Sequence, residues 1–222
     1  MLEDLVDIQS SSWAVWSEDF GSAKCIEHNS KNIYNLINDN KNILKPHIIF
    51  MGLNRSGKKK SKKNGRNTAM AAFHNFHLPN KNGDRNLCDF IQKAQLNSLI
   101  GGYMTDINTR IVDPISHNVE TNIEDENILM KQLRILGEKS YYIICFGKKT
   151  FDCFRDIIKI RPIDVKEIPP CRIKYFEAEY NDYYLGVFGV WHYSNWGRYK
   201  SKLQKLREQL VKLNDLCRLT TG

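Results

Sequence analysis

The sequence has no long apolar run and no apolar segment at its start. Runs such as positions 48–51 and 141–146 are only a few residues long, whereas a membrane-spanning helix needs about 20. Positions 1–9 carry three acidic residues and no basic one, which is unlike a secretory signal. We therefore expect a cytoplasmic protein that has no contact with membranes.

Metal-binding patterns are also missing. The six cysteines, at positions 25, 88, 145, 153, 171 and 217, include no C-x-x-C pair and have no histidine at zinc-finger spacing. His74 and His77 form an H-x-x-H pair without an evident third ligand. We expect reduced, structural cysteines and a protein that uses neither a metal nor a cofactor.

The signatures of several enzyme classes are absent as well. The sequence contains no G-x-S-x-G, no H-E-x-x-H and no paired carboxylates. Gly52 and Gly57 have the glycine spacing of a phosphate-binding loop, but Lys59 stands where Ser or Thr would coordinate magnesium. A magnesium-dependent nucleotide hydrolase, which EDTA should silence, is therefore only a weak alternative.

What the chain does have is an ordinary globular composition with one unusual basic segment. Its 222 residues are 41% hydrophobic and 26% charged, which indicates a single folded domain over 1–222. The net charge of +8 is concentrated in positions 55–66, which hold no acid. The bases there are Arg55, Lys58, Lys59, Lys60, Lys62, Lys63 and Arg66. Such a segment is either a solvated loop or import signal, or a binding site for an anion such as nucleic acid.

Apolar periodicity predicts four buried strands separated by helices. The strands are expected at 47–53, 101–107, 141–146 and 183–191, and the helices at 32–40, 67–76, 86–96, 122–136, 148–158 and 197–216. Gly137 is expected to end the fourth of these helices, and 161–171 is expected to be a loop. This alternation predicts a three-layer α/β/α sandwich around a central, mostly parallel, four-stranded sheet.

Polar residues follow these strands, at the sheet edge where α/β proteins bind ligands. Gly52-Leu53-Asn54-Arg55 follows the first, Thr105-Asp106 lies in the second, and His192-Tyr193-Ser194-Asn195-Trp196 follows the last. In order and spacing, these motifs resemble those of the uracil-DNA glycosylase superfamily. Two family prolines are replaced here, one by Arg55 and one by Tyr193.

The resemblance implies a metal-free, monofunctional enzyme that hydrolyses the N-glycosidic bond of a flipped-out base and leaves an abasic site. By match to the family motifs, Asn54 orients the water and His192 stabilises the departing base. The base would lie among Gly52, Leu53, Asp106 and an aromatic residue, Phe76 or Phe73. DNA would be held by Arg55, the lysines of the basic segment, Ser194, Asn195 and Arg198. Trp196 would be inserted into the DNA double helix. We expect a monomer that binds DNA.

Asp106 bears on which base is removed. Uracil readers often have Asn at this position, but a carboxylate only accepts hydrogen bonds, which suits the exocyclic amine of cytosine. Because removal of normal cytosine would destroy the host genome, we expect a modified cytosine such as the glucosylated hydroxymethylcytosine of some phage DNAs. The chain is thus similar to bacterial antiphage glycosylases.

Alternatives remain open for the residues and for the function. Asn54 and Asp106 can be turn residues, His192 a buried strand-end residue, and Phe76 and Trp196 core residues. The protein can also be a repair glycosylase for uracil or another deaminated base, or a non-catalytic nucleic-acid sensor of the same fold.

Overall fold

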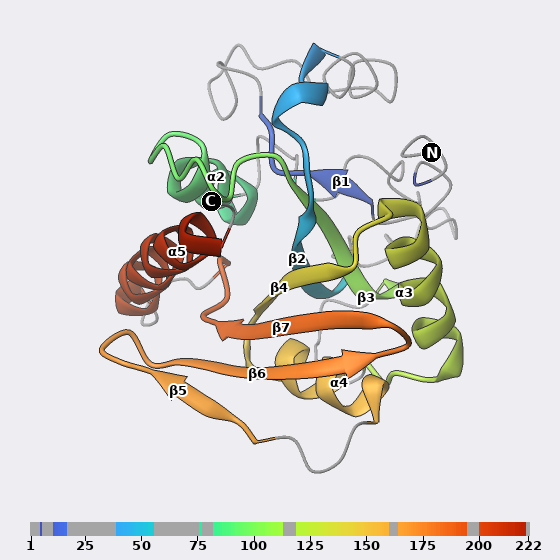
Figure 1. The fold of residues 1–222 in the computed structure, drawn as a ribbon. Coiled ribbons are helices and arrows are strands. Elements are labelled where there is room, and N and C mark those ends of the chain that lie inside the picture. Colours follow the sequence, from blue (N-terminus) through green and yellow to red (C-terminus); the bar gives the residue numbers. More distant parts are fainter. Residues whose placement is uncertain are drawn as a thin grey trace, which may run out of the picture.

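The chain folds around one seven-stranded sheet (Figure 1). The computed structural model describes residues 5, 11–16, 39–55, 76, 82–112, 119–159, 164–194 and 200–220. The strands are β1 (Ser12–Trp13), β2 (Lys45–Arg55), β3 (Gly102–Val112), β4 (Ser140–Phe146), β5 (Lys166–Ile168), β6 (Ile173–Tyr180) and β7 (Tyr183–Val190). The helices are a 3-10 turn (Lys41–Ile43), α2 (Asn82–Ile91), α3 (Ile123–Leu136), α4 (Lys148–Ile158) and α5 (Lys200–Thr220). The predicted α/β class is confirmed.

The sheet order is β1-β3-β2-β4-β7-β6-β5. All four predicted strands are present, and they form its parallel centre, β3-β2-β4-β7. The predicted number of four strands is wrong, because β1, β6 and β5 extend this centre with antiparallel pairing. β1 has only two residues, and β5 lies inside the segment expected to be a loop, so neither shows a clear periodicity.

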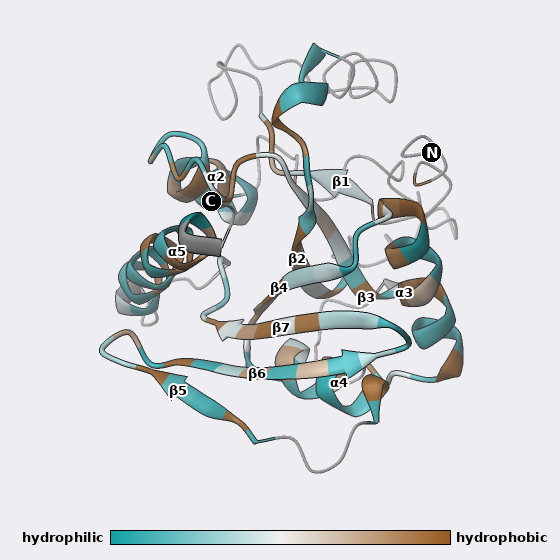
Figure 2. Cartoon of the chain, in the orientation of Figure 1, coloured by the Kyte–Doolittle hydropathy of each residue, from teal (hydrophilic) through white to brown (hydrophobic). Residues whose placement is uncertain are grey.

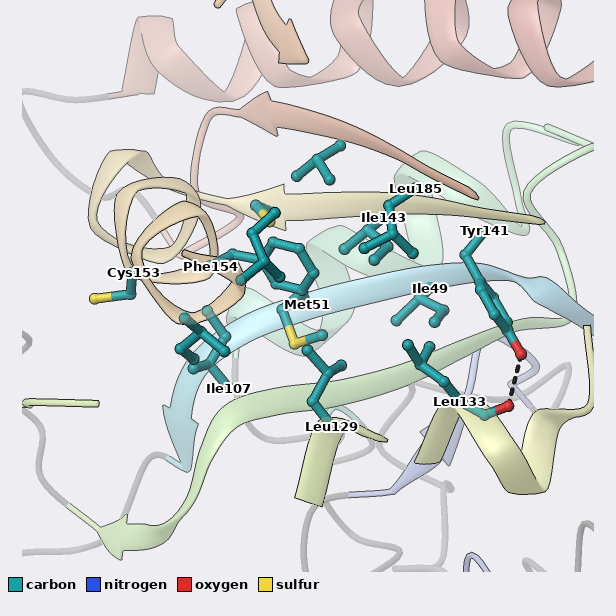
Figure 3. Packing of buried hydrophobic residues seen from close by; sticks show 14 of the residues in the cluster. Ile49, Met51, Ile107, Leu129, Leu133, Tyr141, Ile143, Cys153, Phe154 and Leu185 are labelled. Atoms are coloured by element: carbon teal, nitrogen blue, oxygen red, sulfur yellow. Dashed lines mark hydrogen bonds between the residues drawn. The ribbon is translucent and has the colours of Figure 1, made fainter. Parts of the chain in front are cut away.

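Helices cover both faces of the sheet, as predicted. Successive residues of β2 point to opposite faces, so that Ile49 and Met51 belong to one core cluster and Ile48 and Phe50 to the other. The first cluster packs against α3 and α4, and the second against α2 and α5. Figure 3 shows part of the first cluster, including the hydrogen bond from the Tyr141 hydroxyl to the carbonyl of Leu133. Figure 2 shows the polar and apolar sides of α3 and α5.

The helix ends follow the local sequence. Asn122 and Asp125 form a reciprocal capping box at the start of α3, and Gly137 ends that helix with a φ of 77°, as predicted. α4 has the predicted limits. α2 begins at Asn82 rather than at position 86, and the predicted helix at 67–76 lies outside the described residues apart from Phe76.

Two further findings concern the described ranges only. No helix there combines the length and apolarity that crossing a bilayer requires. The described cysteines, Cys88, Cys145, Cys153, Cys171 and Cys217, have free thiols.

Candidate functional site

The candidate site lies where the parallel strands end. β2 contributes Gly52 and Asn54, β3 contributes Asp106, and His192 follows β7. Because parallel strands have their carboxyl ends at the same edge of the sheet, the motifs that are distant in sequence meet there. Two groups of contacts define this edge, one around Asp106 and one around His192.

The first group is built on Gly52. Gly52 and Asp106 are direct partners in the β2–β3 ladder. A Cβ atom at position 52 would lie 2.1 Å from Oδ1 of Asp106 and 3.4 Å from Cζ of Phe76. The carboxylate and the edge of the aromatic ring therefore share the space that a side chain at position 52 would fill. The structure thus brings together three residues that the sequence assigned to base binding.

Phe76 is fixed from the N-terminal segment. Its side chain is 2% exposed, and its φ of 67° is unusual for a bulky residue. The indole Nε1 of Trp16 donates to the carbonyl of Phe76 at 3.2 Å, and Trp16 in turn exchanges two hydrogen bonds with the side chain of Gln92. Trp16 was not assigned to the site from the sequence, since no spacing links it to Phe76. It holds Phe76 in a backbone conformation that costs free energy.

The second group is built on His192. Its ring lies against Gly147, where a Cβ atom would be 3.4 Å from Cδ2 of the imidazole. The backbone N–H of Ser194 donates to Nδ1 at 3.1 Å, and the Ser194 hydroxyl oxygen is 2.8 Å from the same nitrogen. Since Nδ1 accepts the backbone hydrogen bond, the proton of a neutral imidazole resides on Nε2. Although the residue keeps some solvent exposure, burial of the ring lowers the pKa of His192 to about 4.

Tyr193 connects the two groups. Its ring stacks on His192 with centroids 4.5 Å apart, meets Phe146 edge-on at 5.0 Å, and lies 6.1 Å from the ring of Phe76. At the start of α2, Gly83 gives it room, because a Cβ there would be 3.2 Å from the Tyr193 ring. Asn86 of α2 donates to the Tyr193 carbonyl. Contacts to His192, β4 and α2 therefore hold Tyr193 in place.

Asn54 lies at the end of β2 and is half-buried, opposite Asn108 of β3. Asn108 is fully buried and donates to the carbonyl of Glu120 and to Asp125, at 3.1 and 3.4 Å. These contacts fix the backbone beside Asn54. They also give hydrogen-bond partners to the buried amide of Asn108, which stands on β3 two residues beyond Asp106.

Several of the proposed DNA-binding residues lie outside the described residues. They are Lys58, Lys59, Lys60, Lys62, Lys63, Asn195, Trp196 and Arg198. Arg55 is the last residue of β2, and its side chain is outside the described part. Ser194 is exposed, as a phosphate contact requires, and Leu53 is buried in the α3–α4 cluster. Among the described residues, no group of His, Cys, Asp and Glu is arranged to hold a metal ion.

In comparisons with known proteins, no protein-family model and no curated protein matches this chain. What the site can do must therefore be judged from its own groups. It offers a carboxylate acceptor beside an aromatic ring, a neutral imidazole with its proton on Nε2, and an amide at the end of β2. Such a set suits recognition of a planar, hydrogen-bonding ring and stabilisation of negative charge that develops on it.

Proposed function

We propose that the protein is a DNA glycosylase that excises a modified cytosine by N-glycosidic hydrolysis. The observation that carries this proposal is the position of the Asp106 carboxylate, over Gly52 and beside Phe76. There it lies at the same sheet edge as a histidine that burial keeps neutral. A base that enters this edge meets an acceptor for its amine and a donor for its oxygen.

The fold supports the proposal in one respect. The four parallel strands β3-β2-β4-β7 are contiguous and have helices on both faces, as expected for a sheet like that of uracil-DNA glycosylases. On this view, β1, β5 and β6 are additions to a glycosylase-like centre. The motifs then lie at the strand ends, where that family holds its base.

Asp106 supplies the preference for cytosine. Its oxygens accept hydrogen bonds and, when ionised, donate none, so the exocyclic amine of cytosine is a suitable partner. Uracil places a carbonyl oxygen at the same position, and two acceptors would then face each other. A buried polar group that is left unpaired costs about 1–3 kcal/mol, which is sufficient to discriminate between the two bases.

His192 and Asn54 supply the chemistry. The C1′–N1 bond breaks with its electron pair moving to the base, and the Nε2 proton of His192 is hydrogen-bonded to the base oxygen on which the negative charge gathers. Asn54 orients a water molecule, whose hydroxyl adds to C1′ while its proton is released to the base or to solvent. An amide suffices for this role because bond breaking precedes attack.

DNA is held, in this proposal, by the basic segment 55–66 together with Ser194, Asn195 and Arg198. Their contacts go to phosphates and are independent of sequence. Trp196 fills the gap that the flipped nucleotide leaves in the stack. Removal of modified cytosines is useful against phages whose genomes carry them, so we propose a role in antiphage defence.

The test is a panel of DNAs incubated with the purified protein in EDTA. The panel contains uracil, cytosine, hydroxymethylcytosine and glucosylated hydroxymethylcytosine, and hot alkali converts abasic sites into strand breaks. Breaks only in DNA with modified cytosine support the proposal. Breaks only in uracil DNA replace it with a repair glycosylase, and the absence of breaks in every DNA overturns the enzymatic function.

A non-catalytic sensor is the second candidate, and the burial of Phe76 favours it. At 2% exposure, the ring offers a base almost no accessible face to stack on. Asn54→Ala separates the two functions. In an enzyme it abolishes strand breaks and leaves DNA binding intact, whereas a sensor has no turnover for it to remove.

A further inference from the structure

The backbone on both sides of His192 is held by side-chain amides from two helices. On the N-terminal side, the N–H of Trp191 donates to Oε1 of Gln209 on α5 at 2.8 Å. On the C-terminal side, the carbonyl of Tyr193 accepts from Nδ2 of Asn86 on α2 at 2.9 Å. Figure 1 shows that β7 ends beside α5 and that α2 lies next to this helix. The histidine of the candidate site thus lies between two hydrogen bonds that come from outside the sheet.

Gln209 lies where β6 and β7 separate. The last pair of their ladder on the side of the site is Lys174 with Gly189. Two residues further along the chain, the N–H of Trp191 bonds to Gln209, whose Nε2 donates at 3.1 Å to the carbonyl of Cys171 in the β5–β6 turn. The Gln209 side chain is 2% exposed, and its amide takes the place of a bond between the two strands. An apolar side chain would leave the N–H and the carbonyl without these partners, which is unfavourable.

Two peptide units flank His192, and each is held at both of its polar atoms. In the first, whose N–H bonds to α5, the carbonyl is that of Val190 and accepts from the N–H of Gly147 at 2.8 Å. In the second, whose carbonyl bonds to α2, the N–H is that of Ser194 and donates to Nδ1 of the imidazole. Because a peptide unit is planar, holding both units restricts the direction in which the side chain leaves the backbone. The position of Nε2 then depends on the backbone on either side.

We propose that Gln209 and Asn86 are positioning residues that hold His192 where its Nε2 proton meets the oxygen of the departing base. This inference rests on the proposed function, because it concerns how that base is stabilised. A donor to a developing charge must be held to within about 0.5 Å of its productive position. Both amides act through the backbone of the segment that follows β7, so their loss should affect the chemical step more than the binding of DNA.

Gln209→Met is the first test of this role. Met has a similar length and fills the space, but it lacks the amide. The substrate is a duplex that carries one glucosylated hydroxymethylcytosine. We expect kcat to fall about 10- to 100-fold and KM to change less than about 2-fold, since the groups that read the base are untouched. Asn86→Leu removes the bond on the other side and should change kcat in the same way, so it provides the test if Gln209→Met does not fold.

The titration of the His192 ring is a second readout, and it needs no substrate. Burial lowers the pKa of this ring to about 4. In an NMR titration of the wild type, its signal should therefore remain that of a neutral imidazole from about pH 7 to 5.5. A ring released by loss of either amide gains contact with water, so its pKa should rise toward the ordinary value of about 6.5. The signal is identified by its absence from His192→Gln.

Asn214→Leu is the matched control. Asn214 lies on the same helix as Gln209 and also holds a backbone N–H, that of Ser98, at 2.8 Å. Ser98 precedes β3 and so lies toward the opposite edge of the parallel strands. The substitution should lower the melting temperature, as Gln209→Met does, without altering kcat, KM or the titration of His192.

The outcomes separate this inference from the proposed function. An unchanged kcat or an unchanged His192 titration in the folded variants of Gln209 and Asn86 overturns their role while the glycosylase remains. Equal changes in Asn214→Leu overturn it as well, because the effect is then one of stability alone. If the wild type breaks no DNA of the panel, the proposed function fails, and the titration decides separately whether the two amides hold the ring.

Discussion

The carboxylate of Asp106 occupies the position that a side chain at residue 52 would take, 2.1 Å from where its Cβ would be. The backbone of Gly52 is that of an ordinary extended strand, so its torsion angles do not require glycine. Glycine is required there because the side chain of another residue approaches so closely. The two residues form one unit, and a change at either alters the other.

Gly52→Ala should displace Asp106 and so reduce excision. We expect kcat/KM to fall by at least about 10-fold, together with a loss of about 1–3 kcal/mol in the free energy of unfolding from overpacking. Gly186→Ala on β7 is the control, since its added Cβ would lie 3.3 Å from the Tyr142 ring, away from the site. Equal loss of activity in both variants would show that the effect is one of stability alone.

Asp106→Asn should change the preferred base. An amide can donate to the O4 of uracil and still accept from N3–H, so excision of uracil should appear while that of modified cytosine falls by about 10- to 100-fold. The measurement is strand breakage across the same panel of DNAs. If the ranking of bases and the rates both stay as in the wild type, Asp106 does not read the base.

His192 should make stability fall in mild acid. Its pKa is lowered to about 4 by burial, whereas the unfolded chain takes up the proton near pH 6.5. Between these values the unfolded state binds more protons, so the free energy of unfolding decreases as the pH falls from about 6.5 to 4, by at most about 3 kcal/mol. Urea titrations across this range measure the slope.

His192→Gln is the control for that slope. His47, whose pKa is also lowered by burial, is present in both proteins, so the difference between them isolates His192. The same slope in the variant would contradict a buried, neutral imidazole. In the wild type, kcat should show no ionisation near pH 6.5.

Trp16→Phe should loosen Phe76. It removes the indole hydrogen bond to the Phe76 carbonyl, worth about 1 kcal/mol, and leaves the aromatic packing largely in place. We expect KM for the modified duplex to rise severalfold. Trp13→Phe is matched to it, because Trp13 packs edge-on against Tyr103 in the other core cluster and should lose stability without a change in KM.

The basic segment should govern the salt dependence of DNA binding. Replacing Lys58, Lys59 and Lys60 with alanine removes up to three phosphate contacts, so the slope of log K against log salt should decrease by up to about 3 units. Fluorescence anisotropy on one duplex at several salt concentrations measures it. An unchanged slope would show that the segment is a solvated loop that makes no contact with DNA phosphates.

The sequence predicted the parallel centre of the sheet because its strands are buried on both faces and read as continuous apolar runs. β6, with the sequence IKYFEAEY, was missed although its second half, from Phe176 to Tyr180, alternates between more buried and exposed residues. The signal was present in this alternation and in Asn181-Asp182, a pair with positive φ that turns the chain into β7.

For the site, spacing and strand order were enough to bring Gly52, Asp106 and His192 to one edge. They did not reveal that Gly52 and Asp106 pair in register, since the register of parallel strands depends on packing across the sheet. Nor did they link Trp16 to the site, because its hydrogen bond to Phe76 joins segments 60 residues apart along the chain.

The antiparallel strands beyond β7 also affect whether copies of the chain can associate through the edge of the sheet. β7 is rich in aromatic and apolar residues, and as an outer strand it would offer its backbone to another molecule for sheet extension. β6 takes up that side of β7, and the sheet ends instead at β5, a three-residue strand with exposed Lys166 and Glu167. The segment that leads to His192 is thereby protected from self-association into aggregates.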